Sequence, residues 1–162
     1  MNKFEKVSFE QYRAAVGGDA DLRAEYDDIK LPERKTTHSA GYDFHSPFAF
    51  DLAPQESIKI PTGVKAYITE GRFLAMFVRS SIGFKYGVVL SNGTGIIDCD
   101  YVDNADNEGH IFIKLVNLST EGKTLHANKG DAIAQGIFMP YDITVDDEAS
   151  GIRTGGIGST SK

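Results

Sequence analysis

Short apolar segments separated by proline, glycine or asparagine dominate the chain from residue 31 onward. Several of them alternate polar and apolar side chains, which is the pattern of strands with one buried face. Many short strands at this spacing favour an all-β fold, a jelly-roll-like sandwich or barrel, over a parallel α/β sheet. The expected strands span residues 42–46, 48–52, 57–60, 64–69, 73–78, 110–118, 132–139 and 141–145.

Composition along the chain predicts one domain with two appendages. Residues 1–31 are predicted to be a variable N-terminal extension, partly helical, with an edge strand at 4–9 and helical segments at 10–16 and 19–28. The β domain spans residues 32–145 and contains one short internal helix, 80–86. Residues 146–162 are mostly small and polar, which predicts a flexible, glycine-rich C-terminal arm.

Charge and cysteine content exclude several classes of function. The net charge of -6 argues against a nucleic-acid-binding surface, which needs a basic patch. The single cysteine, Cys99, cannot form an internal disulfide. The sequence shows neither a leader with an apolar core nor an apolar run of membrane-spanning length, so we expect a cytoplasmic protein without a membrane partner.

The stretch from Val88 to Tyr101 carries the most chemical information. Two apolar segments flank an Asn92-Gly93 turn, which predicts a β-hairpin, and Gly95 allows main-chain amides to approach a ligand closely. Two acids and an aromatic residue, Asp98, Asp100 and Tyr101, follow directly. This arrangement offers main-chain groups to a flat base, an aromatic face to a sugar and a carboxylate to a water molecule, so it predicts a nucleotide site.

Two other segments are suited to phosphate groups. Arg79-Ser80-Ser81 lies where a predicted strand gives way to a helix, and exposed amides, two hydroxyls and a guanidinium suit an anion. The tail from Arg153 to Thr160 contains three glycines that free the main chain to wrap an anion. Because no strand precedes this tail and no helix follows it, it is not a dinucleotide-binding fingerprint.

Five stretches stand out along the chain, in this order: Ala40-Gly41-Tyr42-Asp43, Arg79-Ser80-Ser81, Gly95-Ile96-Ile97-Asp98-Cys99-Asp100-Tyr101, Gly130-Asp131-Ala132-Ile133-Ala134-Gln135 and the Arg153–Thr160 tail. Together they resemble the signature motifs of the trimeric dUTPase (deoxyuridine 5′-triphosphate nucleotidohydrolase) family. The longer segment Val102–Glu108, where most members have a short Arg-Gly, resembles a subgroup of Gram-positive bacteria and their phages. The resemblance implies a homotrimeric Mg²⁺-dependent hydrolase that converts dUTP to dUMP and pyrophosphate.

The resemblance also assigns roles around the base and the reacting phosphate. Asp98 would be the general base that activates water for attack on the α-phosphorus, and Gln135 would contact the phosphates or that water. Asn92 and its neighbouring main chain would bind uracil, with Gly95 and Ile97 also contacting the substrate. Tyr101 would pack on the deoxyribose and leave no room for a 2′-hydroxyl.

The remaining assignments concern the triphosphate and its metal ion. The resemblance implies phosphate binding by Arg79, Ser80 and Ser81, and an outer-shell role for Asp43, which would contact Mg²⁺ through water. Arg153 would clamp the β- and γ-phosphates as the arm closes over a site built by other subunits. The arm residues assigned to the substrate are Ile157, Gly158 and Ser159.

The chain departs from the family at two positions, Ala132 and Ile157. The family commonly has arginine at the first and a phenylalanine that stacks on uracil at the second. Isoleucine covers a base without ring stacking, so we expect weaker closure of the arm.

Each assignment has a purely structural alternative. Asp98, Asp100 and Asp131 would then be turn residues, and Asn92 a hairpin residue. Tyr101 would be a core tyrosine, and Ser80 or Ser81 a helix N-cap.

Two other functions remain open from the sequence. A dCTP deaminase shares the fold and the Arg-Ser-Ser motif, but it needs a glutamate in the strand where this chain has Lys114. A dUTP-sensing regulatory protein without catalysis, with a partner protein if it is phage-encoded, would bind dUTP without consuming it.

Overall fold

Short antiparallel strands make up most of the protein. The computed structural model describes residues 1–18 and 21–156. The strands are β1 (Lys3–Lys6), β2 (Tyr42–His45), β3 (Phe50–Leu52), β4 (Ser57–Pro61), β5 (Val64–Tyr67), β6 (Arg72–Val78), β7 (Val88–Leu90), β8 (Gly95–Ile97), β9 (Phe112–Asn117), β10 (Leu125–Ala127) and β11 (Ala132–Pro140). The helices are α1 (Phe9–Val16), α2 (Arg23–Asp27) and α3 (Ser80–Tyr86). These elements confirm the all-β prediction.

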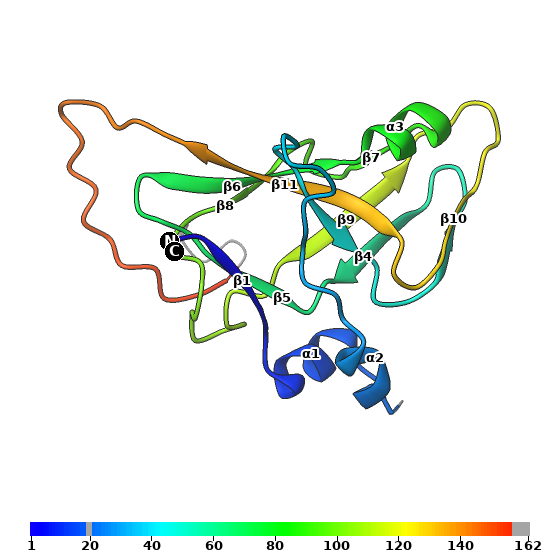
Figure 1. Ribbon diagram of the computed structural model, residues 1–162, viewed down its shortest axis with the longest axis horizontal. Helices are drawn as coiled ribbons and strands as arrows, with labels where there is room; N and C mark the ends of the chain where they lie inside the picture. Colours follow the sequence, from blue (N-terminus) through cyan, green and yellow to red (C-terminus); the bar gives the residue numbers. More distant parts are fainter. Residues whose placement is uncertain (19–20, 157–162) are drawn as a thin grey trace.

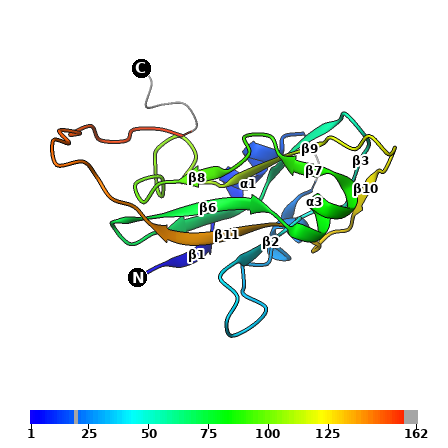
Figure 2. The ribbon, with the colours of Figure 1, turned by 90° about the horizontal axis from the view of Figure 1, so that it is seen from above.

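Two antiparallel sheets form the body, in the strand orders β2-β11-β6-β8 and β4-β9-β7. Figure 2 shows them as two layers, with β6 and β11 in one and β7 and β9 in the other. One core cluster contains Phe44 and Leu74 from the first sheet and Ile60, Ile113 and Leu115 from the second, each at most 2% exposed. Burial of apolar side chains between the two sheets therefore holds the sandwich together.

The predicted hairpin between residues 88 and 97 is wrong in its pairing. β7 pairs with β9 and β8 pairs with β6, so the two strands lie in different sheets. The tight turn is present, because the Gly93 amide donates to the Leu90 carbonyl at 2.9 Å and Gly93 has a φ of 72°. A turn signal is local, whereas pairing is decided by which distant strand offers a matching face. The turn therefore carries the chain from one sheet to the other.

The predicted internal helix is confirmed at the predicted ends. α3 spans Ser80–Tyr86 and stops at Gly87, which has a φ of 67°. The structural alternative, in which Ser80 or Ser81 is the N-cap of this helix, is wrong, because the N-cap residue is Arg79.

The predicted strand at 141–145 is wrong, and β10 was not predicted. The ladder between β11 and β6 ends where Pro140 lies opposite Arg72, so the residues that follow run past the start of β6. Ile143 and Val145 are accordingly exposed. β10 has three residues and pairs with β3. So short a segment shows too little alternation of polar and apolar side chains to be predicted as a strand.

The N-terminal segment packs into the body. β1 pairs with β5, and Val7, Tyr12 and Ile29 belong to the core cluster. The predicted edge strand at 4–9 is the shorter β1, and the two predicted helical segments are α1 and the shorter α2. Figure 1 shows both helices together at one side of the sandwich. Among the described residues, no helix has both the length and the apolar character that crossing a membrane requires.

The chain after β11 contains neither helix nor strand up to residue 156. In Figure 1 this arm, coloured orange to red, leaves the end of β11 and returns to the loop that follows β8. Contacts with acidic side chains fix its return. Arg153 forms ion pairs with Asp98 and Asp100, and the Gly156 amide donates to Asp106.

Candidate active site

A cleft of about 520 Å³ lies where the loop between β7 and β8 meets the end of β8. We call it cleft A. Its lining contains six of the predicted site residues, Asn92, Gly95, Ile97, Asp98, Tyr101 and Arg153. Main-chain hydrogen bonds fix the loop that carries Asn92. The Ser91 amide donates to the Lys114 carbonyl at 2.8 Å, and the Thr94 amide donates to the Asn92 carbonyl at 2.8 Å. The turn and the strand end therefore face one cavity.

Tyr101 forms a rigid wall of cleft A. It is 7% exposed, and its hydroxyl donates to the His110 carbonyl at 3.0 Å and accepts from the Asn107 amide at 2.9 Å. Burial raises the pKa of the Tyr101 phenol, so the ring stays neutral. A neutral aromatic ring held at both sides of its hydroxyl suits packing against a sugar.

Asp98 contributes a carboxylate to the lining of cleft A, and Arg153 of the C-terminal arm contacts this carboxylate. Arg153 Nη2 lies 2.6 Å from Asp98 Oδ2, and Arg153 Nε lies 2.8 Å from Asp100 Oδ1. The guanidinium also lies 5.8 Å from the centroid of the Tyr101 ring. Arg153 is the better buried partner, with a side chain 14% exposed against 51% for Asp98. The arm thus brings a positive charge onto the predicted general base of its own chain.

A second cleft, of about 360 Å³, contains the predicted phosphate and metal residues, and we call it cleft B. Its lining includes Asp43, Arg79, Ser80, Ser81 and Gln135. The sheet explains this grouping, because Gln135 lies opposite Asp43 in the β11–β2 pairing and Arg79 directly follows β6. Arg79 Nε lies 3.2 Å from Asp43 Oδ1, so the arginine is held by a buried carboxylate.

Clefts A and B lie at opposite ends of β6. Arg79 follows the C-terminal end of β6. Ile97 lies opposite Leu74, so Asp98 comes next to the N-terminal end of β6. The step from residue 73 to residue 79 corresponds to about 20 Å at roughly 3.3 Å per residue. In Figure 1, α3 and the loop after β8 accordingly appear at opposite ends of the sheet. One bound nucleotide would not reach both groups within a single chain.

Comparison with known proteins shows what kind of protein carries these clefts. Residues 27–161 match the family model for dUTPase. A deoxyuridine 5′-triphosphate nucleotidohydrolase of Lactococcus lactis is 46% identical over 134 residues, which cover 82% of this chain and 88% of the relative. The chain belongs to the dUTPase family.

Solved dUTPase structures agree with this assignment. The crystal structure of the dUTPase from Streptococcus mutans is 36% identical, with a TM-score of 0.66, and the match covers 87% of this chain and 97% of that one. The Lactococcus and Streptococcus relatives confirm the Gram-positive subgroup. The dUTPase of phage phi11 of S. aureus, at 22% identity and a TM-score of 0.64 over 93% and 97% of the two chains, shares the fold, and that protein coordinates a structural Mg(II) ion.

The residues of cleft B fit a magnesium ion that a triphosphate carries. Within residues 1–18 and 21–156, no group of three His, Cys, Asp or Glu is placed to hold a metal by itself. Asp43 is 6% exposed, and its Oδ2 has no hydrogen-bond partner within the described residues. A buried carboxylate oxygen in this state fits an acceptor for metal-bound water.

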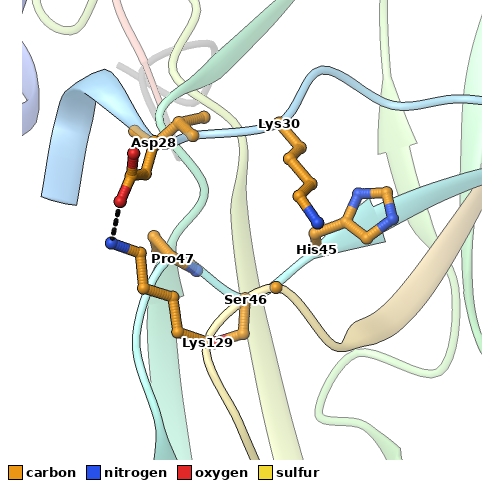
Figure 3. A pocket seen from close by; sticks show the side chains of 8 residues that line it. Asp28, Lys30, His45, Ser46, Pro47 and Lys129 are labelled. Atoms are coloured by element: carbon orange, nitrogen blue, oxygen red, sulfur yellow. Dashed lines mark hydrogen bonds and ion pairs between the residues drawn. The ribbon is translucent and has the colours of Figure 1, made fainter.

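A third cleft, of about 260 Å³, lies between the N-terminal segment and the end of β2. Figure 3 shows Lys129 paired with Asp28, at 2.7 Å, and the Lys30 side chain directed toward His45. Burial lowers the pKa of His45. The lining contains none of the residues that the dUTPase motifs assign to the substrate.

The sequence predicts no substrate-binding role for two lysines of cleft A, Lys59 and Lys114. Lys59 and Lys114 line it and lie opposite each other in the β4–β9 pairing, with Lys59 Nζ 4.2 Å from the centroid of the Phe112 ring. The sequence points to Lys114 only as the position where a deaminase has its acid. The sequence signal that could have identified these two lysines is their place at an outward-facing position of a predicted strand.

Three assigned arm residues, Ile157, Gly158 and Ser159, lie outside the described residues.

Proposed function

We propose that the protein hydrolyses dUTP to dUMP and pyrophosphate, with Asp98 as general base. The observation that carries the proposal is cleft A, where a carboxylate at a strand end faces the same cavity as the Asn92 turn and the Tyr101 ring. Membership in the dUTPase family and the relatives named deoxyuridine 5′-triphosphate nucleotidohydrolase support it.

In the proposed reaction, Asp98 accepts a proton from water as the water oxygen attacks the α-phosphorus. The bond between the α-phosphorus and its bridging oxygen breaks, and pyrophosphate leaves. Gln135 binds the phosphates or orients this water. Arg79, Ser80 and Ser81 hold the phosphate chain, and Arg153 clamps the β- and γ-phosphates. Asp43 would hold a magnesium ion through water, and such an ion would neutralise part of the triphosphate charge.

Selectivity in this proposal comes from cleft A. Asn92 and its main chain bind uracil, with Gly95 and Ile97 beside it, and a mismatched base leaves polar groups unpaired. The Tyr101 ring excludes a 2′-hydroxyl because it is buried and held in place.

We further propose a homotrimer with sites between subunits. Asp98 and Arg79 lie about 20 Å apart along β6, so a complete site needs cleft A of one copy and cleft B of another. The division into an N-terminal extension (1–31), a β domain (32–145) and an arm (146–162) is part of the same proposal. We also place the protein in the cytoplasm, because its one cysteine cannot form an internal disulfide.

The test is to incubate the protein and Mg²⁺ separately with dUTP, UTP, dTTP and dCTP, and to follow pyrophosphate and ammonia together. Pyrophosphate from dUTP alone is expected, and Asp98→Asn is expected to abolish it because the amide cannot accept the proton. Asp51→Asn is the matched control, since Asp51 is exposed and pairs with His126. Removal of Mg²⁺ by a chelator should also stop turnover.

The same assay separates the alternatives. Ammonia from dCTP would make the protein a deaminase. Tight dUTP binding without either product would make it a nucleotide sensor, for which a regulatory partner protein should be sought.

A further inference from the structure

The inserted segment Val102–Glu108 is anchored at both of its ends. Glu108 accepts hydrogen bonds from the Ser8 amide at 2.8 Å and the Ser8 hydroxyl at 2.6 Å, next to the start of α1. Asp103 pairs with Lys65 at 2.6 Å and accepts from the Tyr67 hydroxyl at 2.9 Å. The segment is therefore an ordered loop that is fixed to the N-terminal segment and to β5.

The middle of this loop holds Tyr101. Asn107 Nδ2 donates to the Tyr101 hydroxyl at 2.9 Å, and Asn104 Nδ2 donates to the Tyr101 carbonyl at 2.8 Å. Asn107 is itself held, because its Oδ1 accepts from Asn104 Nδ2 at 2.8 Å and from the Gly109 amide at 3.0 Å. Asn107 is absent from the lining of cleft A. Asn107 therefore acts on the cleft only through the Tyr101 ring, which it holds in place.

The same loop also holds the arm. The Gly156 amide donates to Asp106 Oδ2 at 3.0 Å. A Cβ atom on Gly156 would lie only 2.7 Å from Asn107 Nδ2, so the arm main chain packs directly on this asparagine. Adjacent loop residues thus contact the ring of cleft A and the arm that crosses it.

We propose that Val102–Glu108 is a positioning loop, in which Asn107 sets the discrimination between deoxyribose and ribose through Tyr101. The inference rests on the proposed role of Tyr101 in dUTP hydrolysis. A ring fixed by a second hydrogen bond cannot shift to admit a 2′-hydroxyl, and loss of that bond lets it move.

The test is a double-mutant cycle between Asn107→Asp and Tyr101→Phe. Asn107→Asp keeps Oδ1 and its two accepted hydrogen bonds but removes the donor to Tyr101. Selectivity is measured as the ratio of kcat/KM for dUTP to that for UTP, and as the ratio of Kd for UMP to Kd for dUMP, which needs no turnover. We expect Asn107→Asp to lower both ratios roughly five-fold. In the Tyr101→Phe background the same substitution should change them by less than about two-fold, because the hydroxyl acceptor is gone.

The cycle also cancels any electrostatic effect of the new negative charge on the nucleotide, because the charge is present in both backgrounds. Equal losses in the two backgrounds, or unchanged selectivity of Asn107→Asp, would overturn the inference. Asp103→Asn is the matched control in the same loop, since its partners are Lys65 and Tyr67. If the wild type and this control fail to consume dUTP, the proposed function fails, whereas the dUMP and UMP binding ratios still decide the inference.

Discussion

At the scale of single residues, His110 shows how the packing behind cleft A constrains a titratable group. Its side chain is fully buried, and its Nε2 accepts from the Gly63 amide at 2.8 Å. Its Nδ1 has no partner within the described residues. Burial lowers its pKa to about 4, against a smaller opposing effect of Glu108. The imidazole is therefore neutral near pH 7, with Nε2 as the acceptor.

This pKa predicts a loss of stability in mild acid. Between about pH 6.5 and pH 4 the unfolded chain binds a proton at His110 that the folded chain does not, so the unfolding free energy falls as the pH falls. The full effect is up to about 3 kcal/mol. Urea denaturation at pH 7 and pH 4.5 measures it. His110→Gln should show a smaller drop than the wild type, and the exposed-site control His126→Gln should show the wild-type drop. An identical drop in all three proteins would contradict the prediction.

At the scale of elements, the N-terminal segment is part of the fold and of the support for the candidate site. α1 presents Tyr12 to the core with 0% exposure, and the Tyr12 hydroxyl donates to Glu25 of α2 at 2.6 Å. The Tyr12 ring also lies 6.3 Å from the His110 ring. One tyrosine therefore connects both helices to the strands behind cleft A.

Truncation of the Tyr12 side chain should strongly lower the unfolding free energy. Tyr12→Ala removes a buried ring and should lower the unfolding free energy by about 3 to 5 kcal/mol. Tyr12→Phe removes only the hydrogen bond to Glu25 and should cost about 1 kcal/mol. Denaturant unfolding monitored by circular dichroism gives both values. A loss below about 1 kcal/mol for Tyr12→Ala would mean that the segment is a loose appendage.

Elements could be predicted from the sequence where the residues that determine them are close together in the chain. The ends of α3 could be predicted, because Gly87 stops the helix within its own turn. The pairing of β7 and β8 could not, because it depends on β9 and β6, which are distant in the sequence. The same holds for the site. The motifs identified the residues of clefts A and B, but their separation along β6 and the contact of Asn107 with Tyr101 exist only in the folded chain.

At the scale of the whole molecule, the proposed function makes the distance between the clefts an argument for assembly. Asp98 and Arg79 lie about 20 Å apart along β6, and a subunit packed against another could bring cleft B of one to cleft A of the other. In the isolated chain, Arg153 pairs with Asp98 instead. A triphosphate held by a neighbouring subunit would compete for this guanidinium and free the carboxylate to accept a proton.

Subunit mixing tests this arrangement directly. Asp98→Asn and Arg79→Ala are each expected to be nearly inactive. If Asp98 and Arg79 of one site come from different subunits, randomly mixed trimers should regain about a quarter of wild-type activity, because half the subunits retain each group. The two variants are unfolded together, refolded and assayed for pyrophosphate release from dUTP. Asp98→Asn mixed with Asp98→Ala is the control and should stay inactive, since every subunit lacks the base. No recovery from mixtures whose subunits are shown to exchange would mean that each chain builds its own site.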